Sequence, residues 1–123
     1  MLFRSLSLGS AIDFIKSIGV KKVEEEVSNL TRHLVLELGK LSSVEMMPGV
    51  AFDLKTASTG IVSFVPLFEI ERLECLLAQN RINLRIGQHC SKGVIDSVRV
   101  SLHAYNNIDD LDHLLNVLKN IEV

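Results

Sequence analysis

The apolar positions of this chain follow a helical period over long stretches and alternate in others. Spacings of three or four residues predict a helix over residues 11–18, ended by Gly19, and a longer amphipathic helix over residues 20–41. A run of three glutamates at 24–26 is predicted to be a solvated face near the start of that helix. Two further helices are predicted over residues 68–80 and 108–121, the last with Asn107 as its N-cap.

Alternating and β-branched stretches supply the predicted strands. Residues 60–65 are predicted to form a buried strand that Pro66 ends, and residues 82–86 and 98–103 alternate as strands do. Residues 44–47 and 50–54, on either side of a Pro-Gly turn, predict short edge strands. The resulting order predicts one α+β domain over residues 1–123, a small sheet covered by helices on one side. The pattern does not give the strand order.

Composition narrows the function classes. A net charge of −2 gives no electrostatic reason to expect nucleic acid or an anionic membrane. The presence of one tyrosine and no tryptophan argues against a base-stacking surface. No apolar run approaches the roughly 18 to 20 residues that span a bilayer. Residues 1–9 are interpreted as the stub of a helix whose earlier part is missing. Two cysteines fifteen residues apart predict neither a disulfide framework nor a metal site, so a cytoplasmic location is expected.

The candidate chemistry lies in Arg85-Ile86-Gly87-Gln88-His89-Cys90 and in Arg99. Cys90 stands in a polar, glycine-containing segment, where His89 and Lys92 favour the thiolate form. Cys75, between Leu73 and Leu76 on a predicted helix, is instead predicted to be a small buried side chain.

The two arginines each have two interpretations. Arg99 either binds a carboxylate with its guanidinium fork or is a solvated residue on the outer face of a strand. Arg85 is expected near the same sheet edge, where it orients the loop or lies on the surface.

The histidines give less indication of chemistry than Cys90 and the two arginines do. His89 either tunes the thiol or caps its loop. His103 is expected on the surface, and His33 and His113 lack partners at metal-ligand spacing.

Five segments, in order, resemble the C-terminal region of the cysteine desulfurase and selenocysteine lyase family, within the class V aminotransferases that use pyridoxal phosphate. They cover nearly the whole chain: Ala11-Ile12-Asp13-Phe14-Ile15, Gly60-Ile61-Val62-Ser63-Phe64, the segment from Arg85 to Cys90, Arg99-Val100-Ser101-Leu102 and Tyr105-Asn106. The Arg-x-Gly-x-His-Cys motif is similar to that of the SUF-type branch. The resemblance implies the small C-terminal domain of a fold-type I pyridoxal-phosphate enzyme.

The resemblance also implies roles for these residues. Cys90 attacks the sulfur of substrate cysteine and becomes a persulfide, leaving alanine, while Arg99 holds the substrate carboxylate; Arg85 and His89 are expected beside them. In the family the large domain supplies the cofactor lysine and the phosphate-binding groups. Here none of the seven lysines stands in a context resembling the family's His-Lys. Gln88 replaces the first histidine of the usual pair, and the segment between Cys90 and Arg99 is shorter than usual.

Four hypotheses follow. The chain is a detached or truncated small domain, inactive alone; a subunit of a split enzyme whose other chain carries pyridoxal phosphate; a non-enzymatic persulfide carrier that uses Cys90; or a folded relic. An exposed domain-packing face predicts a homo-oligomer or a separate large-domain chain as partner, and a sulfur-acceptor protein fits the family chemistry. The sequence does not decide between these alternatives, nor between cysteine and selenocysteine as the substrate.

Overall fold

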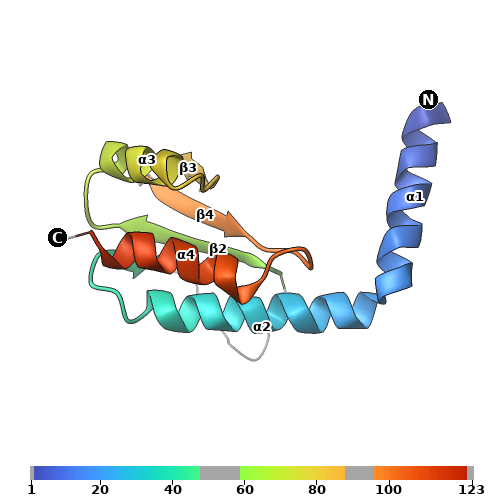
Figure 1. Cartoon of the computed structure of the whole chain (residues 1–123), viewed down its shortest axis with the longest axis horizontal. Helices are drawn as coiled ribbons and strands as arrows, with labels where there is room; N and C mark the ends of the chain where they lie inside the picture. The colour runs from blue at the N-terminus through green and yellow to red at the C-terminus, as the bar shows by residue number, and fades with distance from the viewer. Residues whose placement is uncertain (1, 48–58, 88–95, 122–123) are drawn as a thin grey trace.

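A computed structural model of the chain describes residues 2–47, 59–87 and 96–121. Figure 1 shows an α+β fold in which a four-stranded sheet lies against a layer of helices. The elements, in chain order, are α1 (Leu2–Ile18), α2 (Val20–Leu38), β1 (Val44–Met46), β2 (Ile61–Pro66), α3 (Ile70–Gln79), β3 (Arg85–Gly87), β4 (Ser97–Ser101) and α4 (Ile108–Lys119). The predicted fold class is confirmed.

The sheet has the order β1-β2-β4-β3, and every neighbouring pair is antiparallel. The two central strands turn Val62, Phe64, Val98 and Val100 to one face, because alternate residues of a strand share a face. All four of these side chains are buried. The opposite face carries polar residues, including Ser63 and Arg99.

The core forms where three helices cover the apolar face of the sheet. Leu34 and Leu38 of α2, Leu73 of α3, and Leu115 and Leu118 of α4 are at most 1% exposed and belong to one cluster with the strand residues. The prediction that helices cover one side of the sheet is therefore confirmed. This packing leaves the polar sheet face without a covering helix among the described residues.

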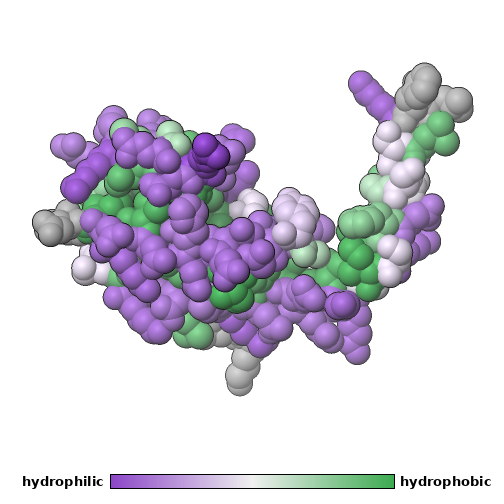
Figure 2. All heavy atoms as spheres, viewed as in Figure 1, coloured by the Kyte–Doolittle hydropathy of each residue, from purple (hydrophilic) through white to green (hydrophobic). Residues whose placement is uncertain are grey.

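The first helix projects away from the rest of the molecule (Figure 1). Gly19 separates α1 from α2 with a φ of 96°, a left-handed conformation that favours glycine, as its predicted role as a helix terminator requires. Apolar side chains remain exposed on α1 and at the start of α2, and Figure 2 shows this apolar surface. They are Leu6, Leu8, Ile12, Phe14 and Val20, each at least 44% exposed.

Several predicted boundaries are corrected. The helix predicted over residues 20–41 ends at Leu38, and the strand predicted over residues 82–86 begins only at Arg85. Of the two predicted edge strands, the first is β1, and residues 50–54 lie outside the described part of the chain. No helix within the described ranges is long and apolar enough to cross a membrane.

The prediction that Cys75 is buried is wrong, because its side chain is exposed. Leu73 and Leu77 are four residues apart and make the apolar face of α3, whereas Cys75 lies two residues after Leu73, about 200° around the helix. Its sulfur accepts a hydrogen bond from the Gln79 side chain at 3.4 Å, one turn further on. The apolar neighbours of Cys75 in the sequence therefore led to a wrong prediction of the helix face on which Cys75 lies.

Candidate functional site

The polar face of the sheet presents a row of three residues from three strands. Arg99 of β4 is paired with Ser63 of β2 on one side and with Arg85 of β3 on the other. Directly paired residues of antiparallel strands point to the same face, with Cβ atoms about 4.5–5.5 Å apart. The predicted proximity of Arg85 and Arg99 is confirmed. Ser63 was missed as a member of this row, because the sequence pattern does not reveal which strands are neighbours.

Arg99 is half-buried rather than solvated on an outer face. Its Nε atom is buried and makes no hydrogen bond within the described residues. A buried donor without an acceptor costs free energy, and a guanidinium group forms its strongest hydrogen bonds with carboxylates and phosphates. This arrangement therefore suits an anion that brings the missing acceptor to Arg99. Arg85 is exposed, and so its guanidinium group lies nearer to solvent.

The predicted thiol, Cys90, and its neighbour His89 lie outside the described residues, and their roles stay predictions. The structure fixes the two ends of the segment that carries them. Gly87 pairs with Ser97, and the buried Ser97 hydroxyl donates to the Gly87 carbonyl at 3.2 Å. This pair lies two residues beyond Arg85 and Arg99, or about 7 Å along the strands. The connection that carries Cys90 thus begins and ends beside the arginine pair.

The remaining histidines take part in structural contacts. His33 of α2 lies 2.9 Å from Asp112 of α4, and His113 contacts the Asn80 carbonyl at 3.0 Å. His103, expected on the surface, is half-buried and stacks on Tyr105 with ring centroids 5.0 Å apart. Within the described ranges, His, Cys, Asp and Glu form no group that could hold a metal ion.

Charged residues also link the two long helices of the body. Glu37 of α2 contacts Lys40 and, at 3.9 Å, Lys119 of α4. The hydrogen bond from Lys40 lowers the pKa of the Glu37 carboxyl. These groups lie on the helix layer, so they stabilise the scaffold and do not contribute to the arginine row.

The described lysines do not fit a pyridoxal-phosphate site. A cofactor lysine must stand in a pocket that orients the ring and excludes water. The five lysines within the described ranges, Lys16, Lys21, Lys22, Lys40 and Lys119, are all exposed on helices or at a helix end. None of these five lysines therefore fits the role of the cofactor lysine.

Known proteins resemble this chain in sequence and in fold. The sequence model of the aminotransferase class-V family matches residues 1–114. Among curated proteins, a probable cysteine desulfurase of Pyrococcus abyssi is 27% identical over 95% of this chain, and a cysteine desulfurase of Yersinia pseudotuberculosis is 25% identical over 95%. The chain spans 30% and 29% of the lengths of these two relatives.

Solved structures of cysteine desulfurases and of the cystine C–S lyase C-DES share the fold. The apo enzyme of Thermococcus onnurineus superposes with a TM-score of 0.74 at 29% identity, covering 88% of this chain and 28% of that one. CsdA of Escherichia coli gives a TM-score of 0.72 at 24% identity, covering 89% of this chain and 28% of that one. A structure of C-DES with glycine linked to its PLP cofactor matches at a TM-score of 0.64 and 20% identity, over 83% of this chain and 24% of that one. The chain is similar in sequence to cysteine desulfurases, and it belongs to the aminotransferase class-V family.

Proposed function

We propose that this chain provides the small-domain part of a cysteine desulfurase-like active site. The observation that carries the proposal is Arg99, which is half-buried on the sheet face that no described helix covers. Its buried Nε has no hydrogen-bond partner among the described residues. Arg85 stands opposite it, and the segment with Cys90 starts two residues away. An amino-acid carboxylate is the anion that this position would bind in a reaction of the family.

The proposed reaction divides the work between two parts of the enzyme. Arg99 binds the carboxylate of L-cysteine with its guanidinium group, and the Cys90 thiolate accepts the substrate sulfur. Breakage of the substrate C–S bond and formation of the S–S bond give L-alanine and a persulfide on Cys90, so that L-cysteine and one thiol yield L-alanine and one persulfide. A sulfur-acceptor protein in the cytoplasm would then take the terminal sulfur.

The cofactor lysine is proposed to come from a large domain outside these 123 residues. The exposed apolar residues of α1 support a partner that covers this helix, either such a large domain or a second copy of this chain. By itself, the 123-residue chain is then expected to produce no alanine. A persulfide carrier that uses Cys90 without any cofactor is the alternative for the isolated chain.

A mixing experiment tests whether this chain and a large domain each supply part of the active site. The purified chain is combined with the large-domain fragment of a related cysteine desulfurase, loaded with its cofactor, and alanine formation from L-cysteine is measured. We expect activity only in the mixture. Arg99→Gln removes the charged fork and should raise KM for cysteine about 10- to 100-fold, because a hydrogen bond to a charged group is worth about 1.5–3 kcal/mol.

The controls separate binding from folding. Arg72→Gln changes an exposed arginine on α3, in the helix layer, and should leave KM unchanged. Cys90→Ser should abolish turnover while circular dichroism shows an unaltered fold. An unchanged KM in a folded Arg99→Gln variant would contradict the role given to Arg99.

A further inference from the structure

The connection that follows α3 holds an arginine in an unusual backbone conformation. Arg81 has a φ of 57°, and it is the one non-glycine residue with a positive φ among the described residues. The Arg81 N–H donates to the Ala78 carbonyl at 3.2 Å and the Ile82 N–H to the Leu77 carbonyl at 2.9 Å. These two bonds form the Schellman motif that ends many helices, in which glycine usually occupies the left-handed position. An arginine is unfavourable there relative to glycine.

Immediately after Arg81 the chain stays away from the neighbouring strand. Residues 82–84 do not continue the pairing of β3 with β4, which begins at Arg85. A groove of about 250 Å³ opens between this segment, the end of β4 and the start of α4. This volume is below the roughly 300–1,000 Å³ of pockets for drug-sized molecules, so the groove suits a small metabolite.

The groove combines an apolar lining with groups of opposite charge. The apolar lining comes from Ile82, Leu84, Val100, Leu102, Leu111 and Leu114. Arg81 and Asp110 both line the groove, yet they form no ion pair with each other or with another described residue. Asp110 Oδ2 accepts the N–H of Asn107 at 3.1 Å, which leaves Oδ1 available.

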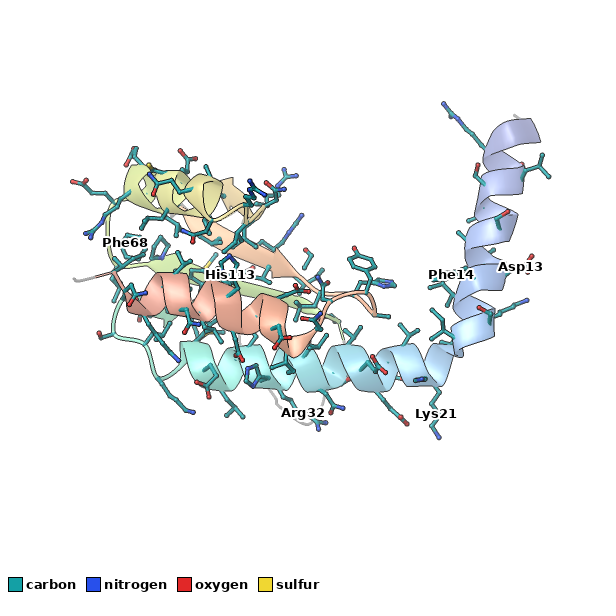
Figure 3. All side chains as sticks on the ribbon, in the orientation of Figure 1. Asp13, Phe14, Lys21, Arg32, Phe68 and His113 are labelled. Carbon is teal, nitrogen blue, oxygen red and sulfur yellow. The ribbon has the colours of Figure 1, made fainter. Side chains whose placement is uncertain are left out.

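Other polar groups complete the rim of the groove. Asn83, Asn106 and His113 also line it. His113 projects from α4 toward the end of α3, where it meets the Asn80 carbonyl (Figure 3). The rim therefore offers a cation, a carboxylate and neutral hydrogen-bonding groups above a layer of aliphatic side chains. These groups are complementary to a small zwitterion that carries an aliphatic tail.

We propose that this groove binds a free α-amino acid with an aliphatic side chain. Arg81 binds its carboxylate, Asp110 binds its ammonium group, and the side chain packs on Ile82 and Leu84, the half-buried apolar residues of the lining. The groove adjoins the C-terminal end of β4, whereas the segment with Cys90 joins its N-terminal end. The site therefore differs from the one that contains Arg99, and it does not depend on the function proposed for that residue.

Nuclear magnetic resonance titration of the full chain tests the site directly. L-leucine is added to the ¹⁵N-labelled chain, and the amide signals of residues 81–84, 100–102 and 110–114 are followed. We expect saturable shifts in these segments. 4-Methylpentanoate, which lacks the ammonium group, and isopentylamine, which lacks the carboxylate, should each bind at least tenfold more weakly, because each loses one charged partner.

Arg81→Gly provides the decisive variant, because glycine suits the left-handed backbone and the fold is kept. Removal of the guanidinium group should weaken leucine binding at least tenfold, and Asp110→Asn should do the same. Arg72→Gln, in the first turn of α3 and outside the groove lining, should bind leucine as the unaltered chain does. Absence of saturable shifts in the unaltered chain, or equal affinity in the Arg81→Gly variant, would overturn the proposal.

Discussion

Gly60 stands where the start of β2 approaches the chain just after β4. The Leu102 N–H donates to the Gly60 carbonyl at 2.7 Å, and Gly60 has a φ of 68°. A Cβ atom at this position would lie 2.7 Å from the Leu102 carbonyl oxygen and 2.8 Å from a methyl group of Val27. Both the backbone conformation and the lack of space therefore require glycine.

Gly60→Ala should lower the free energy of unfolding by about 2–4 kcal/mol, the sum of left-handed strain and overpacking. Urea denaturation followed by circular dichroism measures this loss. Gly9→Ala is the matched control, because Gly9 is helical and a Cβ there meets no atom within 4 Å. That variant should leave stability unchanged or raise it by up to about 1 kcal/mol. Equal stability of the two variants would contradict the packing described around Gly60.

At the residue scale, sequence reasoning placed two arginines near each other but did not give the exposure of side chains. It placed Arg85 and Arg99 near one edge of the sheet, and their pairing confirms this. It could not find the buried Nε of Arg99 or the exposed sulfur of Cys75, because exposure depends on which elements pack together. The roles of Cys90 and His89 stay predictions, since these residues lie outside the described ranges.

Among the elements, α4 was the most predictable. Asn107 was expected to cap it, and the Asn107 side chain accepts the Asp110 N–H at 2.9 Å while Asp110 accepts the Asn107 N–H, a reciprocal capping box. These signals are local in sequence, and so they can be found without the fold. The short β3 shows the converse. The alternation over residues 82–86 did not reveal that only the part from Arg85 onward pairs with β4.

The end of α3 gives a prediction at this scale. Arg81→Gly should raise the free energy of unfolding by about 1 kcal/mol, because glycine occupies the left-handed position without the strain that a Cβ atom imposes. The midpoint of urea denaturation measures the gain. Arg72→Gln, within α3 and away from its end, should change stability by less than about 0.5 kcal/mol. A destabilised Arg81→Gly variant would mean that the arginine side chain contributes more than its backbone conformation costs.

At the scale of the whole molecule, the two faces of the sheet differ, and this difference connects the fold to the proposed function. Helices α2, α3 and α4 bury one face of the sheet, whereas the face with Ser63, Arg85 and Arg99 lacks such a cover within the described residues. Helix α1 exposes apolar side chains away from this body (Figure 2). The sequence predicted the layers from periodicity, but the strand order that creates the arginine row arises from non-local pairing, which local patterns do not encode.

A pyridoxal-phosphate titration of the purified 123-residue chain tests most directly whether the cofactor lysine lies outside this chain. Alanine production from L-cysteine is measured in parallel. We expect no saturable cofactor absorbance band and no alanine, because the described lysines are exposed and the cofactor lysine is proposed to come from a large domain outside these 123 residues. A saturable band with turnover by the chain alone would contradict the account, since a lysine of this chain would then hold the cofactor.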